Sequence, residues 1–85
     1  MPEVKVGKVV KFFAKPCVAA IEMTDGTLSI GDKIKIKGHT TDFEDTIASM
    51  QEDNKPIENA TPGQLIGIKI NDRVREHDIV YKITD

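Results

Sequence analysis

The sequence predicts an all-β domain, specifically a small closed antiparallel β-barrel of six or seven strands. Short apolar runs alternate with turn signals along the whole chain, and glycine or proline stands at most of the breaks. No segment has the sustained 3.6-residue periodicity of a long amphipathic helix. In a chain of only 85 residues, closure into a barrel is the arrangement that leaves no strand edge exposed.

The first half of the chain supplies the clearest strands. An extended run covers residues 4–13, and Gly7 interrupts it as glycine does at a bulge or bend. Lys15-Pro16 ends this run, residues 18–23 form the next strand, and Thr24-Asp25-Gly26 is a turn signal.

A segment bracketed by three glycines, residues 26–38, contains one turn and one strand. Residues 33–37 alternate strictly between lysine and isoleucine. Ile34 and Ile36 are therefore expected to point inward, while the three lysines point outward. Residues 38–42 are a polar loop.

Residues 41–54 fit two interpretations. Thr41 and Glu44 match a capping box, and the next apolar side chains recur at helical spacing, which favours a short helix. The all-β context favours a strand near residues 46–51 instead. Whether residues 42–50 are strand or helix stays open.

The last third of the chain returns to strands and turns. Lys55-Pro56 is a break and residues 57–60 are expected to be extended. The turn Thr61-Pro62-Gly63 leads into a buried strand at residues 64–70. Residues 71–73 are expected to form a loop, and residues 79–83 the final strand.

Composition indicates a single soluble domain over residues 1–85. The chain is 39% hydrophobic and 31% charged, which is typical of a globular protein. No apolar run approaches the roughly 20 residues that span a bilayer, and the first residues lack the features of a signal peptide. We therefore expect a cytoplasmic protein without membrane contact.

Cys17 lies in an apolar run and is expected to be a small buried thiol rather than a nucleophile.

Charge is distributed unevenly between the two halves. Residues 1–40 carry seven lysines against four acidic side chains, whereas residues 41–85 carry five basic residues against ten acidic ones. A basic half attracts polyanions or acidic partners.

Three lysines of the basic half recur about 6.6 Å apart along one strand and can follow a phosphate backbone, although a solvated lysine face is the alternative. The loop at residues 39–42, opposite two arginines, is a second surface for recognition. The predicted contact residues are Lys33, Lys35, Lys37, His39, Arg73 and Arg75.

No catalytic, cofactor or metal site is expected. His39 and Asp42 supply two ligands where zinc needs three or four, and neither histidine forms a recognisable nucleophile pair with Cys17. The acidic clusters lack the ordered spacing of a calcium loop. No Gly-x-x-x-x-Gly-Lys-Ser/Thr run is present to cradle phosphates, so GTP binding is not expected.

Several segments resemble a known family. The pattern Gly-x-Leu-x-x-Gly-Asp-x-Ile-x-Ile-x-Gly at residues 26–38 resembles the second domain of translational GTPases such as elongation factor Tu and initiation factor two. Residues 57–68, with a Pro-Gly turn before a strand with a central glycine, and residues 75–80 resemble later hallmarks of that domain. The family usually has Gly-Asp where this chain has His77-Asp78. Residues 37–43 and 74–78 resemble small stand-alone translation-factor-like proteins of prokaryotes, and related barrels occur at the C-terminus of collagenase-like proteins linked to tRNA hydroxylation.

The resemblance covers roughly residues 6–83 and implies a barrel of the translation-protein domain II type. It implies a non-catalytic module that contacts tRNA, rRNA, the ribosome or another part of the translation machinery. In elongation factor Tu this barrel helps to hold the aminoacyl end of tRNA through polar groups that correspond to Ser49 and Leu65 here, so the chain departs from the family at that pocket. The alternative function is a protein–protein adaptor that docks onto a separate enzyme or RNA-modification protein.

Overall fold

All regular structure is β-strand in the residues that the computed structural model describes, 3–84. The all-β class is as predicted. No helix in these residues is long and apolar enough to cross a membrane. The ten strands are β1 (Glu3–Phe13), β2 (Val18–Met23), β3 (Leu28–Ser29), β4 (Lys33–Lys37), β5 (Asp42–Thr46), β6 (Met50–Glu52), β7 (Lys55–Ile57), β8 (Asn59–Ala60), β9 (Leu65–Lys69) and β10 (Ile79–Ile83).

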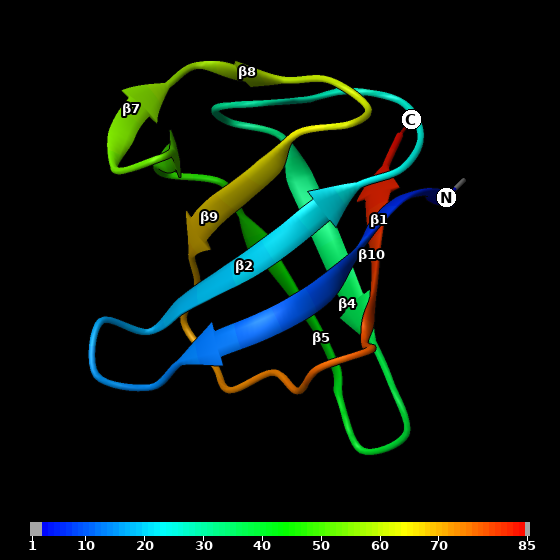
Figure 1. Ribbon diagram of the computed structural model, residues 1–85. Coiled ribbons are helices and arrows are strands. Elements are labelled where there is room, and N and C mark those ends of the chain that lie inside the picture. Colours follow the sequence, from blue (N-terminus) through cyan, green and yellow to red (C-terminus); the bar gives the residue numbers. More distant parts are fainter. Residues whose placement is uncertain (1–2, 85) are drawn as a thin grey trace.

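Eight of the strands form one antiparallel sheet, in the order β5-β4-β10-β1-β2-β9-β6-β7, while β3 and β8 pair separately. The sheet is strongly curved, so that β1, β2 and β9 cross over β4 and β5 (Figure 1). Among residues 3–84, no ladder joins the two end strands β5 and β7. The predicted closed barrel is therefore wrong, because the structure is an open eight-stranded sheet with a two-stranded sheet beside it.

The backbone between β5 and β6 is hydrogen-bonded to the turn before β4. The N–H of Ile47 donates to the carbonyl of Asp32 at 2.9 Å, and its carbonyl accepts from the N–H of Gly31 at 2.8 Å. The backbone N–H and carbonyl of Ile47 are thus both hydrogen-bonded to residues of that turn. At the opposite end of the sheet, β7 contains Pro56, which has no N–H to donate to a further strand.

A side-chain clasp connects β5 to the far half of the sheet in place of a ladder. The carboxylate of Asp45 accepts hydrogen bonds from the backbone N–H of Asn71 at 2.8 Å and from its Nδ2 at 2.9 Å. Asn71 follows β9, which lies five positions away from β5 in the sheet order. The clasp therefore fixes the curvature between two distant parts of one sheet.

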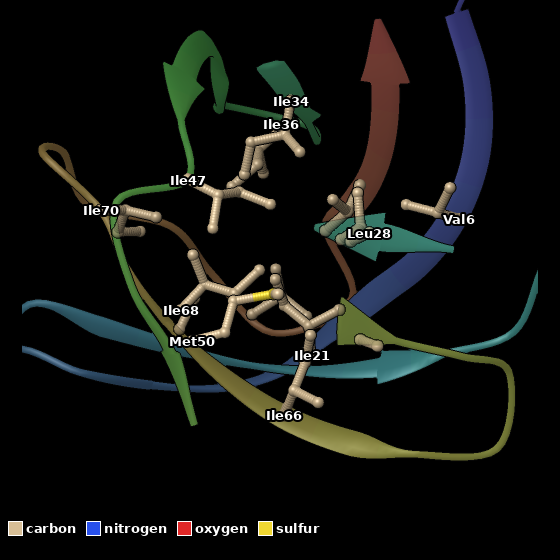
Figure 2. Packing of buried hydrophobic residues seen from close by; sticks show 14 of the residues in the cluster. Val6, Ile21, Leu28, Ile34, Ile36, Ile47, Met50, Ile66, Ile68 and Ile70 are labelled. Carbon is tan, nitrogen blue, oxygen red and sulfur yellow. The ribbon is translucent and has the colours of Figure 1, made fainter. Parts of the chain in front are cut away.

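The concave face of the sheet encloses a single apolar core. Figure 2 shows its side chains converging from both halves of the sheet, with Ile21 and Ile66 from β2 and β9, and Ile34 from β4. Alternation along the strands places these side chains inward. The fully buried core residues include Val6, Val9, Ala19, Ile21, Met23, Leu28, Ile34, Ile36, Ile47, Ile66, Ile68 and Val80.

The two ends of the described chain pair with each other. β1 and β10 are antiparallel neighbours, and Glu3 lies opposite Ile83 in their register. Figure 1 shows both ends at the same corner of the molecule.

Most of the predicted strands are confirmed. β4 and β10 have the predicted bounds, and Ile34 and Ile36 are fully buried. The turns predicted at residues 24–26 and 61–63 contain glycines with positive φ, at 61° and 93°.

Two local predictions are wrong. Residues 42–50 contain no helix, and the single strand predicted at residues 46–51 is replaced by β5 and β6 on either side of Ile47. Cys17 is half-buried rather than buried. It lies in the turn before β2 with a φ of 55°, so the reversal of the chain rather than the apolar run sets its position.

The bulge predicted at Gly7 is confirmed, because the β1–β10 register shifts between Lys5 and Gly7. The backbone of β2 approaches Gly7 closely: a Cβ there would meet the carbonyl oxygen of Glu22 and, at 3.1 Å, the side chain of Ile21. The neighbour is main chain in the middle of a sheet, and so it cannot move aside cheaply.

We expect Gly7→Ala to lower the free energy of unfolding by about 2 kcal/mol, because the added methyl overpacks this contact. Urea denaturation followed by circular dichroism measures the change. The exposed neighbouring variant Lys8→Ala is the control and should change stability by less than about 0.5 kcal/mol. Equal stability of the two variants would contradict the close approach.

We expect Asp45→Ala to destabilise the fold by about 1–2 kcal/mol, because the two donors of Asn71 lose a charged acceptor. The loss should be local first, so the amide of Asn71 should exchange with deuterium faster than other protected amides in the variant. Glu76→Ala, which removes an exposed carboxylate outside the clasp, is the matched control. Unchanged exchange at Asn71 in Asp45→Ala would disprove the clasp.

Candidate functional site

Acidic side chains of neighbouring strands lie beside the predicted lysine stripe. The Nζ of Lys35 is 3.4 Å from a carboxylate oxygen of Glu3 on β1 and 3.9 Å from one of Asp42 on β5. The Nζ of Lys37 is 3.9 Å from the other oxygen of Glu3. Lys35 and Lys37 therefore belong to an ion-pair network that joins three strands.

The electrostatic state of Lys35 reflects this network. Partial burial would lower the pKa of Lys35, but the charges of Glu3, Asp42 and Glu44 outweigh that effect and raise the pKa. Its side chain is only 19% exposed. Lys33, at the end of the stripe, lines a small hollow with residues 44–46. A phosphate backbone would have to displace these internal carboxylates.

The structure brings part of the second predicted surface together around one hollow. Arg73 and Arg75 line a hollow of about 330 Å³ together with Asp72 and residues 40–43 of the β4–β5 hairpin. His39, at the tip of the same hairpin, is exposed and does not line the hollow. The structure thus places the two arginines on one hollow, which neither His39 nor the lysines of the stripe line.

Aspartates fix the backbone of the loop that carries both arginines. The carboxylate of Asp72 accepts a hydrogen bond from the N–H of Arg73 at 2.7 Å, and that of Asp78 accepts from the N–H of Arg75 at 2.9 Å. Between the arginines, Val74 is buried in the core. The loop is therefore held at three points over a few residues.

Two further contacts tie this loop to its surroundings. Gly38 of the hairpin packs against the buried carboxylate of Asp78 so closely that a Cβ would overlap it. His77 adopts a φ of 75°, and its N–H donates to the carbonyl of Val9 at 2.8 Å. Positive φ is a conformation that glycine adopts at less cost than histidine, so the backbone at His77 is strained.

An apolar groove on the convex face of β2 and β9 is a site that the sequence reasoning missed. Its volume is about 410 Å³, and an adjoining hollow of about 440 Å³ shares four of its lining residues. Two large apolar side chains in it are exposed to solvent, Phe13 by 44% and Leu65 by 56%. The groove is lined by Phe13, Pro16, Val18, Ala20, Gln51, Asp53, Asn54, Leu65, Ile66 and Gly67.

The sequence did contain a signal for this groove. Phe12 and Phe13 are adjacent in one strand, as are Leu65 and Ile66 in another. Since successive side chains of a strand point to opposite faces, one member of each pair has to face outward. Both outward members lie on the same groove.

The part of the chain that the structure describes contains no group of three or more histidine, cysteine, aspartate or glutamate side chains placed to hold a metal ion. The thiol of Cys17 faces the carbonyl oxygen of Asp72, with Sγ at 3.8 Å from it. The N–H of Ile70 donates to the carbonyl of Cys17 at 3.0 Å. Cys17 thus connects the turn before β2 to the loop after β9.

Comparison with known proteins relates the chain to peptidases. No family model matches it. It is 42% identical over 84 residues, 98% of this chain and 20% of the other protein, to an uncharacterised protease of Methanocaldococcus jannaschii. It is 36% identical over 81 residues to a collagenase of Porphyromonas gingivalis, covering 94% of this chain and 20% of that protein. The chain therefore spans about a fifth of the length of these curated relatives.

Solved structures share the fold. The C-terminal domain of a putative U32 peptidase of Geobacillus thermoleovorans superposes with a TM-score of 0.88 at 15% identity, covering 95% of this chain and 93% of that one. The selenomethionine variant of the same domain gives 0.83, with 89% and 95% covered.

These findings correct the family and the function predicted from the sequence. The similar proteins are named proteases and collagenases, and the similar fold is that of a U32 peptidase domain rather than the second domain of a translational GTPase. The predicted identity as a translation-factor-like protein, and with it the RNA-binding function, is wrong. The roles of the six predicted contact residues stay predictions. The chain corresponds to one fifth of proteins named as proteases or collagenases and has the fold of a U32 peptidase C-terminal domain.

Proposed function

We propose that this chain is a non-catalytic accessory domain of a U32-type peptidase and acts by docking onto protein. The observation that carries the proposal is the match of 98% of the chain, at 42% identity, to only 20% of a protein named as a protease. The other four-fifths of such a protein has room for the catalytic machinery. The small domain then serves to position that machinery or its substrate.

The apolar groove is the surface for this docking. Exposed apolar patches on small domains mark interaction sites, and Phe13 and Leu65 are both largely exposed on one groove. The Nζ of Lys11 lies 5.2 Å from the centre of the Phe13 ring, which holds that ring in place at the rim. The occupant we assign is an apolar segment of the remainder of the peptidase, because that remainder accompanies this domain in each curated relative.

The chemistry of Cys17 agrees with a structural role in this domain. Its thiol faces a main-chain carbonyl oxygen, and its own carbonyl anchors Ile70. A nucleophilic thiol needs instead a neighbouring base or cation that lowers its pKa.

We expect the purified chain alone to leave gelatin and casein intact, because peptide hydrolysis belongs to the part of the relatives that it does not match. Gel electrophoresis after long incubation measures this. The matched control is the Cys17→Ser variant, purified in the same way. Cleavage by the native chain that Cys17→Ser abolishes would contradict the proposal.

We expect Leu65→Asp to weaken binding of the chain to the remainder of the Methanocaldococcus protease by about tenfold or more, since burying a leucine is worth about 1.5–3 kcal/mol. The partner is that protease lacking its matched segment, and isothermal titration calorimetry measures the affinity. Phe13→Ser should act in the same direction.

Ile30→Asp is the matched control, because Ile30 is 42% exposed but lies outside the groove. It introduces the same charge and should bind as the native chain does. Equal weakening by Leu65→Asp and Ile30→Asp, or no binding by the native chain, would exclude the groove as the docking surface.

A further inference from the structure

We propose that the hollow between the β4–β5 hairpin and residues 72–75 binds the side-chain carboxylate of an acidic peptide segment. This site shares no lining residue with the apolar groove. It therefore adds a second, charge-selective contact to the proposed docking function and does not depend on the groove.

The hollow is lined by arginine side chains, which are well suited to binding carboxylates. Arg73 and Arg75 are the only arginines of the sequence, and both line it. A guanidinium offers parallel N–H donors that match the two oxygens of a carboxylate. Within residues 3–84, no acidic side chain lies within ion-pair distance of either guanidinium.

The acidic side chains that share the hollow are already engaged elsewhere. A carboxylate oxygen of Asp42 is 3.9 Å from the Nζ of Lys35. The Oδ1 of Asp72 accepts the hydrogen bond from the N–H of Arg73 at 2.7 Å. Neither carboxylate is within ion-pair distance of a guanidinium, so the paired N–H donors of both arginines are left for a ligand.

The loop is organised before any ligand arrives. The backbone N–H groups of Arg73 and Arg75 donate hydrogen bonds to aspartate carboxylates, and the side chain of Val74 between them is buried in the core. Across the hollow, Thr40 and Thr41 carry hydroxyl groups that are suitable donors. A fixed backbone reduces the entropy lost when the side chains close on a carboxylate.

The lining of the hollow suits the side chain of a glutamate. The volume of the hollow is about 330 Å³, which is enough for such a side chain to enter. Phe43, which also lines the hollow, provides an apolar surface for the methylene groups of a glutamate.

The test uses an N-acetylated, C-amidated hexapeptide with two adjacent glutamates in glycine, and its glutamine counterpart. Amide chemical shifts of the full chain are followed during titration in about 20 mM salt, where charge pairs are weakly screened. The glutamate peptide should move the amides of residues 40–43 and 72–75. Arg73→Ala/Arg75→Ala should weaken its binding by about tenfold or more.

Lys15→Ala/Lys55→Ala removes the same charge outside the hollow and should leave the affinity within about twofold. Arg73→Lys/Arg75→Lys keeps the charge but loses the paired donors, so it should bind more weakly than the native chain. Leu65→Asp should bind the peptide normally, which separates failure of this site from failure of the groove.

Four results would overturn the assignment. They are no shift of these amides at millimolar peptide, equal weakening by the arginine and lysine double variants, equal binding of the glutamine peptide, and tighter binding of inorganic phosphate than of the glutamate peptide. The last result would show a site for a free anion rather than for peptide.

Discussion

The structure depends on one constraint, which is that a single sheet has to bury its own inner face. The described chain contains no helix to cover that face, so the sheet curves until its two halves pack on each other. Isoleucines from β2, β9 and β4 meet in the interior as a result. Both proposed binding surfaces lie outside this core, one on the convex face and the other among the loops at the end of the sheet.

Sequence periodicity predicted the parts of the fold that local geometry decides. The lysine–isoleucine alternation of residues 33–37 gives a strand with the predicted bounds, and Gly7 marks a real bulge. Closure of the sheet was not predictable in this way, because it depends on whether the two end strands β5 and β7 pair with each other. The local pattern of neither strand decides that pairing.

The same distinction applies to the candidate surfaces. Placing both loops at one end of the sheet predicts that Arg73 and Arg75 lie opposite the hairpin. The ion pair between Lys35 and Glu3 could not be predicted in this way, because Glu3 lies far away in the sequence. The family resemblance misled for a related reason. The glycines of residues 26–38 satisfy backbone requirements, with φ of 61° at Gly26 and 94° at Gly31. Such requirements recur wherever a tight turn precedes a strand. A glycine pattern of this kind therefore indicates the backbone conformation and does not by itself identify a family.

The pairing of the first and last strands determines how the domain can be attached to another polypeptide. Glu3 lies opposite Ile83, and both ends leave from the same corner (Figure 1). The β4–β5 hairpin and the loop after β9 point away from that corner. A tether at either terminus therefore presents the arginine-lined hollow outward in the same orientation. Adjacent termini also suit insertion of the whole unit into a surface loop of a host, or circular permutation, without altering the interior.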